Sequence, residues 1–236
     1  MLIILLWYNY EESMRILYKS CSKILAVYME DSKVNEVGSV ILHPKPVGIA
    51  VQAGPVAIGD RILVSDADFS RILGVSLLTP MTTVLATIGQ GPGQVNFPKG
   101  IAVDPNTRNI FVVDGSNHRV QKFSPNFVFI KAWGSDGTGD GQFSFPKGIA
   151  IDSNDDIYVV DFGNHRVQKS DVRGNFIKAW GSPGSGDGQF NEPVDITFNK
   201  LNGTLLVSDF ENRNIQVFTT NGVFSGKVQF DIIVHP

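Results

Sequence analysis

Residues 97–104 read FPKGIAVD, and residues 145–152 read FPKGIAID. The stretch FVVDGSNHRVQKF (111–123) returns as YVVDFGNHRVQKS (158–170) and, more altered, as LVSDFENRNIQVF (206–218). FIKAWGSDGTGDGQF (129–143) returns as FIKAWGSPGSGDGQF (176–190). Aligned positions in these copies are 47 or 48 residues apart. A period of this length indicates supersecondary units that stack on one another.

Each copy contains short apolar runs rich in β-branched residues, such as NIFVVD, RVQKF and FIKAW, separated by clusters of Gly, Pro, Asn and Asp. Strands of this length without helical periodicity predict a four-stranded antiparallel meander. One such sheet cannot bury both of its faces alone, whereas several packed radially can. The sequence therefore predicts an all-β fold, a β-propeller of four-stranded antiparallel blades.

An earlier copy precedes these three, and its segments are KPVGIAV (45–51), ILVSDADFSRIL (62–73) and TTVLATIGQG (82–91). Clear repeats thus cover residues 44–228 of what we interpret as a single domain over 1–236. The flanks 1–43 and 229–236 predict a degenerate or divided blade, with FDIIVHP at the C-terminus as its first strand and the N-terminus as the rest. This gives about five blades. The sequence equally supports a fragment of a larger, six-bladed ring, cut within a blade at each end.

Composition argues against several classes of protein. The chain has 20 basic and 23 acidic residues and a formal charge of −3, which gives no broad attraction to DNA or to anionic membranes. The single cysteine, Cys21, rules out an internal disulfide and disfavours a disulfide-rich secreted module. The N-terminal MLIILLWYNYEE is too short to span a bilayer and lacks the cationic lead of a signal peptide. We therefore expect no membrane association and favour a cytoplasmic location.

The PxGIAVD, VVD, NHRVQ and GxGxGQF segments resemble the NHL repeat, in order and spacing, and carry the triplets Asn117-His118-Arg119 and Asn164-His165-Arg166. This resemblance implies a propeller that usually closes with six blades. Relatives in the family include protein- and RNA-binding ends of TRIM-type regulators, sensor domains of bacterial kinases and a peptide-amidating lyase. The fold does not choose among these activities.

An aspartate ends the second strand of every copy, and an arginine opens the third strand in all but the last, where Asn214 stands. We interpret the aspartates as acceptors for loop N–H groups, with the arginines as charged partners. Repetition in each blade favours a structural role, because an asymmetric site needs one copy only. The structural residues are Asp66, Asp114, Asp161, Asp209, Arg71, Arg119 and Arg166.

The variable part of the repeat is the loop between strands two and three, which reads ADFS (67–70), GSNH (115–118), FGNH (162–165) and FENR (210–213). In a propeller this loop lies on the same side of the ring as the linkers between blades. Apolar and aromatic groups on a polar face mark an interaction site; the alternative is that the phenylalanines pack between blades. The candidate partner-binding residues are Phe69, Phe162, Phe210, His118, His165, Arg213, Lys99 and Lys147.

We therefore expect a non-catalytic binding or scaffold module that presents its linker side to a protein or peptide. One alternative is an RNA-binding surface, although residues 89–228 carry 13 basic and 14 acidic residues, a net charge of −1. A second alternative is an enzyme of the lyase or lactonase type, for which Asp195, Asp104 and Asp152 are the candidate acids. We expect no cofactor and no metal, because His118 and His165 fall on adjacent blades and should not share one ion.

Overall fold

The structure is a computed structural model. It describes residues 2–6, 14–20, 23–30, 33–41, 46–52, 61–76 and 82–230, with side chains in the ranges 47–52, 61–76 and 82–230. In these ranges the chain forms five sheets of four strands, and the strands of each sheet are hydrogen-bonded in chain order. The pairs are antiparallel throughout, as expected for meanders. No helix in the described part of the chain is long and apolar enough to cross a membrane.

The first two sheets contain β1 (Leu2–Leu6), β2 (Met14–Ser20), β3 (Lys23–Glu30) and β4 (Lys33–Ile41), then β5 (Pro46–Gln52), β6 (Arg61–Asp66), β7 (Arg71–Ser76) and β8 (Thr82–Ala86). The third contains β9 (Pro98–Val103), β10 (Ile110–Asp114), β11 (Arg119–Phe123) and β12 (Phe129–Trp133). The fourth contains β13 (Ile149–Ile151), β14 (Ile157–Asp161), β15 (Arg166–Ser170) and β16 (Phe176–Trp180), and the fifth β17 (Pro193–Asn199), β18 (Thr204–Asp209), β19 (Asn214–Thr219) and β20 (Phe224–Gln229). Short 3₁₀ turns occupy Gly115–Asn117 (η1) and Phe162–Asn164 (η2).

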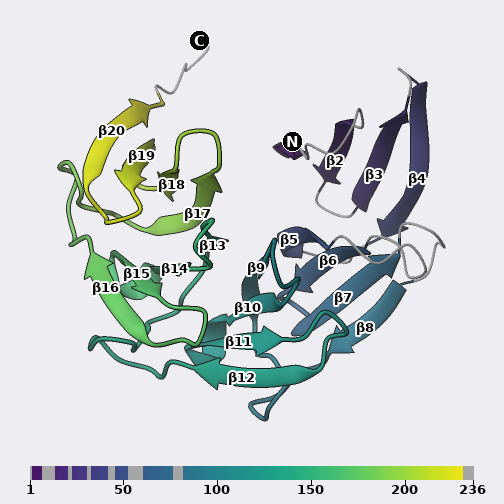
Figure 1. The fold of residues 1–236 in the computed structure, drawn as a ribbon, viewed down its shortest axis with the longest axis horizontal. Coiled ribbons are helices and arrows are strands. Elements are labelled where there is room, and N and C mark those ends of the chain that lie inside the picture. Colours follow the sequence, from purple (N-terminus) through teal and green to yellow (C-terminus); the bar gives the residue numbers. More distant parts are fainter. Residues whose placement is uncertain are drawn as a thin grey trace.

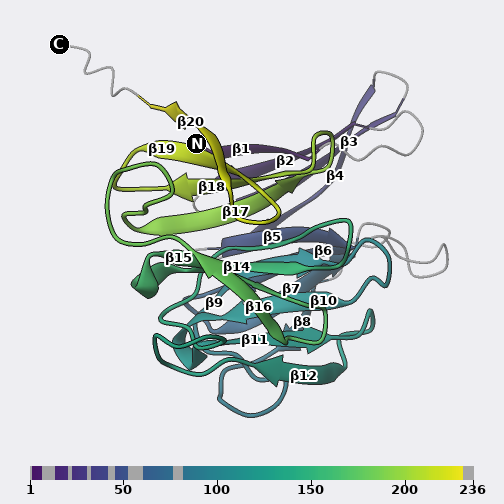
Figure 2. The same cartoon turned by 60° about the vertical axis from the view of Figure 1, so that its left-hand side comes forward.

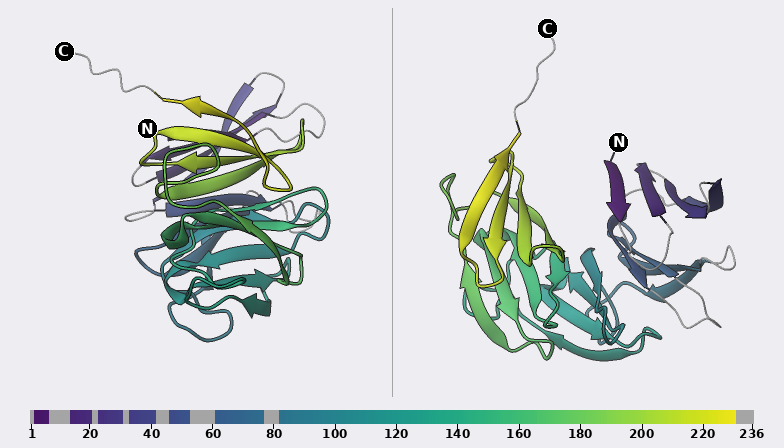
Figure 3. Two further views of the ribbon diagram at one scale, coloured as in Figure 1. Left: turned by 90° about the vertical axis from the view of Figure 1, so that its left-hand side faces the viewer. Right: turned by 45° about the horizontal axis from the view of Figure 1, so that its top comes forward.

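The sheets follow one another around an arc, with the first strand of each blade toward the centre and the fourth at the rim (Figure 1). Figure 2 and the left view of Figure 3 show the sheets from the side, and the right view of Figure 3 shows the first and last sheets at the two ends of the arc. This arrangement is a β-propeller, and the predicted all-β fold class is confirmed.

For residues 1–43 the sequence predicted either a degenerate blade or part of a divided one. Residues 33–41 form a strand, β4, which pairs with β3, so β1 to β4 make a four-stranded sheet without a strand from the C-terminus. The sequence KVNEVGSVI has no counterpart in the other copies, and for this reason the repeat comparison did not identify it as a strand. The C-terminal part of that prediction, residues 231–236, lies outside the described residues.

The interior strands of the middle blades have no exposed face. All five residues of β10 and all five of β14 are buried, because apolar side chains point alternately toward the sheets on either side. Phe111 and Val113 pack toward the fourth sheet with Ile149 and Ile157. β18 instead alternates between buried and half-buried residues, since Leu205 and Val207 pack on the fourth sheet while Leu206 lies on the other face.

The repeated glycine of the PxG segment allows the innermost strands to approach one another. A Cβ on Gly100 would lie 2.7 Å from the carbonyl oxygen of Lys147, and its N–H donates to that oxygen at 2.9 Å. A Cβ on Gly148 would lie 2.6 Å from Cα of Asp195 in the next blade. Only glycine leaves room for these contacts between backbones. The starts of successive inner strands are therefore held together.

Candidate functional site

The register of each blade places the linker and the variable loop at the same end of the sheet. Pro98 pairs with Asp114, and Pro193 pairs with Asp209, so the residues before the inner strand meet the loop after the second strand. We use the name linker face for the surface formed by loops 67–70, 115–118, 162–165 and 210–213 with residues 97–99, 145–147 and 192–194.

Beneath this face, a buried aspartate forms the centre of a hydrogen-bond cluster in the third blade. The Oδ1 atom of Asp114 accepts from the backbone N–H of Asn96 at 2.6 Å. Its Oδ2 atom accepts from Asn117 at 2.9 Å, from Nε of Arg119 at 2.8 Å and from Gln121 at 3.0 Å. These donors satisfy a carboxylate that is fully buried.

The fourth blade repeats this cluster around Asp161. Its donors are the N–H of Ser144 at 2.7 Å, Asn164 at 2.9 Å, Nε of Arg166 at 2.8 Å and Gln168 at 2.9 Å. Arg166 also donates to the linker carbonyl oxygens of Gly139 and Gln142, at 2.7 and 3.0 Å. The cluster thus joins the loop, the third strand and the linker from the preceding blade.

The second and fifth blades have altered clusters. Asp66 accepts from Nε of Arg71 at 2.8 Å, but Phe69 replaces the asparagine of the loop, and Oδ1 of Asp66 has no partner in the described part of the chain. In the fifth blade Asp209 keeps Asn212 at 2.7 Å and Gln216 at 3.3 Å, while Asn214 stands in place of the arginine.

The aspartates and arginines named from the sequence therefore occupy these clusters. The glutamine three positions after the loop of the third, fourth and fifth blades is a further member that the sequence reasoning missed. Its repetition was the available signal, because its amide can donate to the aspartate and also accept from a linker N–H, as Gln168 does from Gly141. These glutamines are Gln121, Gln168 and Gln216.

The two loop histidines connect each blade to the next. Nδ1 of His118 accepts from the N–H of Phe145 at 3.2 Å, and its ring packs edge-on against the Phe145 ring at 4.6 Å between centroids. Nδ1 of His165 accepts from the N–H of Glu192 at 3.5 Å. The two imidazoles thus bind different linkers, and the structure does not bring them together.

The candidate phenylalanines differ in exposure. Phe69 and Phe210 are 54% and 65% exposed, whereas Phe162 is half-buried, with Nζ of Lys147 lying 3.1 Å from its ring centroid. Phe97 and Phe145, which the sequence reasoning did not select, are also exposed on the linker face, at 40% and 55%. They were overlooked because the repeated FPKG segment was read as part of the structural framework.

Phe97 and Phe145 have left-handed backbone conformations, with φ of 52° and 45°. This region is unfavourable for a bulky side chain, and glycine or asparagine adopts it more easily. A buried ring would offset that cost through packing, but these rings stay 40% and 55% exposed and have few contacts, chiefly Lys99 over Phe97 and His118 against Phe145. Packing within the described part of the chain therefore offsets only part of the cost of the backbone conformation.

Cationic side chains lie over several of these rings. Nζ of Lys99 is 4.0 Å from the centroid of Phe97, and Cζ of Arg71 is 4.8 Å from that of Phe69. Burial lowers the pKa of both Lys99 and Lys147 from the usual 10.5, and the neighbouring charge of Lys99 lowers that of Lys147 further. Arg213 is exposed on the same face, where its backbone N–H donates to Phe210 O at 3.1 Å.

The acids proposed for an enzyme are not gathered in one place. Asp104 and Asp152 are buried at the far ends of their inner strands, where they accept from the turn N–H groups of Asn106 and Asn154, both at 2.8 Å. Asp195 lies near the start of β17, at the linker end of its sheet. Within the described ranges no group of three or more His, Cys, Asp or Glu residues is arranged to hold a metal.

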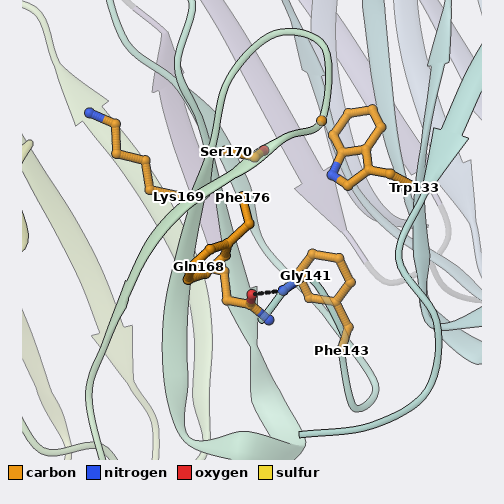
Figure 4. Close-up of a pocket in the computed structure, with 8 residues that line it drawn as sticks. Trp133, Gly141, Phe143, Gln168, Lys169, Ser170 and Phe176 are labelled. Carbon is orange, nitrogen blue, oxygen red and sulfur yellow. Dashed lines mark hydrogen bonds between the residues drawn. The ribbon is translucent and has the colours of Figure 1, made fainter. Parts of the chain in front are cut away.

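A small pocket between the third and fourth blades has a volume of about 10 Å³, room for no more than about one water molecule. Figure 4 shows the rings of Trp133, Phe143 and Phe176 around it, and the hydrogen bond from Gly141 N to Gln168 Oε1 at 3.0 Å. The pocket is a gap in blade packing rather than a ligand site.

Similarity to known proteins agrees with the repeat pattern. The NHL repeat family model matches residues 95–123 and 143–169. Peptidyl-glycine alpha-amidating monooxygenases A and B from Xenopus laevis are 32% and 34% identical to the chain over 120 residues. Those stretches cover 49% of this chain but only 12% and 13% of the two frog proteins.

Solved structures share the fold at low sequence identity. A catalytically inactive virginiamycin B lyase from Staphylococcus aureus, with quinupristin, has a TM-score of 0.66 at 16% identity and covers 99% of this chain and 70% of its own. An auxiliary nutrient binding protein from Bacteroides thetaiotaomicron has a TM-score of 0.62 at 16% identity, over 87% of this chain and 56% of its own. Enzymes and binding proteins thus share this architecture, and the fold alone assigns neither activity. The sheet order shows a β-propeller, and the family model identifies two NHL repeats within it, at residues 95–123 and 143–169.

Proposed function

We propose that this propeller is a non-catalytic binding module whose linker face takes a protein or peptide partner. The supporting observation is the set of exposed phenylalanines that successive blades present there, namely Phe69, Phe97, Phe145 and Phe210. Aromatic side chains on an otherwise polar surface supply most of the binding energy in many interfaces. Their recurrence around the ring gives an extended surface rather than a single pocket.

The left-handed backbone at Phe97 and Phe145 strengthens this proposal. A non-glycine residue held at positive φ costs about 1–2 kcal/mol. The contacts of Phe97 with Lys99 and of Phe145 with His118 offset part of that cost in the free protein. A partner that covers the remaining exposed area would add about 1 kcal/mol for each ring. Binding would therefore offset the part of the backbone cost that packing within the chain does not.

Charge favours protein over RNA as the partner. Asp68, Glu192 and Glu211 lie on the linker face among the basic residues, so a phosphate backbone crossing it would meet repulsion as well as attraction. RNA-binding surfaces need a basic stripe with stacking aromatics. The aromatic groups are present on the linker face, but the acidic residues interrupt the row of basic side chains.

Site-directed photo-crosslinking tests the proposal. A photoreactive phenylalanine analogue placed at Phe97 or Phe210 should crosslink to one defined protein in cell extract, and the Phe97→Ala/Phe145→Ala/Phe210→Ala variant should reduce recovery of that protein about tenfold or more. The matched control uses Ile130 and Ile177, which are 50% and 48% exposed but lie on the outer strands β12 and β16. Equal crosslinking at 130 and 177, or unchanged recovery by the triple variant, would contradict a binding role for this face.

A further inference from the structure

Two lysines start the inner segments of adjacent blades on the linker face. Lys99 belongs to β9, and Lys147 precedes β13 in the equivalent FPKG segment. Their backbones are tied directly, because the N–H of Gly100 donates to the carbonyl oxygen of Lys147 at 2.9 Å. Both are half-buried, and each ammonium group lies over an aromatic ring, Phe97 for Lys99 and Phe162 for Lys147.

Neither ammonium group forms an ion pair with a carboxylate of the described residues. The half-buried arginines that directly follow the loops are different, because Arg71, Arg119 and Arg166 are each bound to a cluster aspartate at 2.8 Å. The charge of Asp68 raises the pKa of Lys99, and the charge of Glu192 raises the pKa of Lys147. In both lysines burial has the larger effect, so both pKa values are lowered. Two like charges, partly withdrawn from water, thus lie on directly hydrogen-bonded strands, close enough for the charge of Lys99 to lower the pKa of Lys147, and neither is ion-paired to a carboxylate of the described ranges.

We propose that Lys99 and Lys147 together bind a carboxylate of an acidic peptide, with the exposed phenylalanines receiving its apolar side chains. A bound carboxylate would accept charge-assisted hydrogen bonds from both ammonium groups and relieve their mutual repulsion. Glycine contacts and ring contacts hold the two strands and side chains in place before binding, which lowers the entropic cost of recognition.

A single carboxylate fits this site better than a polyanion. Asp68 acts on Lys99 and Glu192 acts on Lys147, so each further phosphate of a polyanion would add repulsion from these acids, whereas a single carboxylate carries only one charge. Around the lysines, Phe97 and Phe145 present rings 40% and 55% exposed. An acidic residue beside apolar or aromatic residues is therefore the expected sequence in the partner.

This inference rests on the proposed binding role of the linker face, and selection from a random peptide display library tests its chemistry. Peptides selected on the wild-type chain should be enriched in Asp or Glu next to apolar residues. Fluorescence anisotropy with a selected peptide should then show affinity that falls about tenfold both when its acids become amides and in the Lys99→Gln/Lys147→Gln variant. The Lys99→Arg/Lys147→Arg variant, which keeps the charge, should stay within about threefold of the wild type.

Lys200→Gln is the matched control, since Lys200 is exposed at the opposite end of the fifth blade and should leave affinity unchanged. Circular dichroism confirms that each variant is folded. Selected peptides without acidic enrichment, or equal affinity of the Lys99→Gln/Lys147→Gln variant, would overturn the carboxylate site. Binding of oligouridine in competition with the peptide at equal charge would overturn it in favour of phosphate.

The outcomes separate the two proposals. If selected peptides depend on Phe97, Phe145 and Phe210 but not on the lysines, the linker face is a binding surface and the carboxylate site is wrong. If binding depends on neither set, both proposals fail.

Discussion

The third and fourth blades have complete aspartate clusters, and the second and fifth do not. In the complete clusters the loop asparagine, the arginine and the glutamine all bind the aspartate, and the loop histidine binds the next linker. In the second blade the exposed Phe69 replaces the loop asparagine, whereas the fifth blade keeps Asn212 but has Asn214 in place of the arginine. Phe210 of the fifth blade is exposed, while Phe162, at the same loop position of the complete fourth blade, is half-buried with Lys147 over its ring. Among the loop phenylalanines, those of the altered blades are therefore the more accessible to a partner.

The largest expected effect comes from breaking a complete cluster. Asp161→Ala removes the acceptor for Arg166, Gln168 and Asn164, and it should lower the free energy of unfolding by about 3–5 kcal/mol. Asp66→Ala should cost roughly half as much, because one oxygen of Asp66 already lacks a partner in the described part of the chain and Arg71 is one-third exposed. Urea denaturation measures both; equal losses would show that the clusters do not differ in strength.

A smaller effect should follow from completing the fifth cluster. Asn214→Arg places a guanidinium in the position that Arg119 and Arg166 occupy, within reach of Asp209, and removes the buried amide oxygen of Asn214, which has no partner in the described ranges. We expect the free energy of unfolding to rise by about 1 kcal/mol. A fall on urea denaturation would mean that Gln229, which pairs with Asn214 across β19 and β20, prevents the ion pair.

The smallest expected effect concerns the lysine pair and depends on pH. Burial lowers the pKa of Lys99 and Lys147 below 10.5 in the folded chain, so between the lowered values and 10.5 the unfolded chain binds more protons. Their contribution to stability therefore rises with pH through that window. The Lys99→Gln/Lys147→Gln variant lacks this contribution, and its stability relative to the wild type should decline between neutral pH and 10.5.

The size of this change should be about 0.5 kcal/mol or less, because solvent screens groups that are only half-buried. Lys200→Gln, which alters an exposed lysine, serves as the control. A difference between variant and wild type that stays constant over the pH range would contradict the assigned burial.

Much of the framework was predictable from local pattern. Alternating apolar runs, turn residues and a period of 47 or 48 residues specify meanders that must stack, and the repeated Asp and Arg were correctly placed at the two sides of one turn. The N-terminal sheet shows the limit of this reasoning. Its fourth strand, β4, carries no repeat signature, so only pairing with β3 reveals it.

The candidate site was less predictable. Phe97 and Phe145 belong to the most repeated segment of the sequence, FPKG, yet the structure exposes them. Phe162 lies under Lys147 of its own blade, and the loop histidines contact the linkers of the next blades. The exposure of Phe97 and Phe145 depends on their left-handed backbone conformation and on which blade packs beside each loop. The amino-acid pattern of a single repeat shows neither.

The sequence by itself determined the blades. Each repeat contains its own alternating strands, its turn residues and the glycine that lets inner strands approach, and backbone geometry and burial require all three. The pairing of each arginine with its aspartate is local, but the tertiary structure alone decided that Lys99 and Lys147 lie in adjacent strands. Arg119 and its aspartate lie five residues apart, whereas Lys99 and Lys147 lie 48 residues apart and become neighbours only when blades pack. An electrostatic site of this kind depends on distances between blades, which no single repeat encodes.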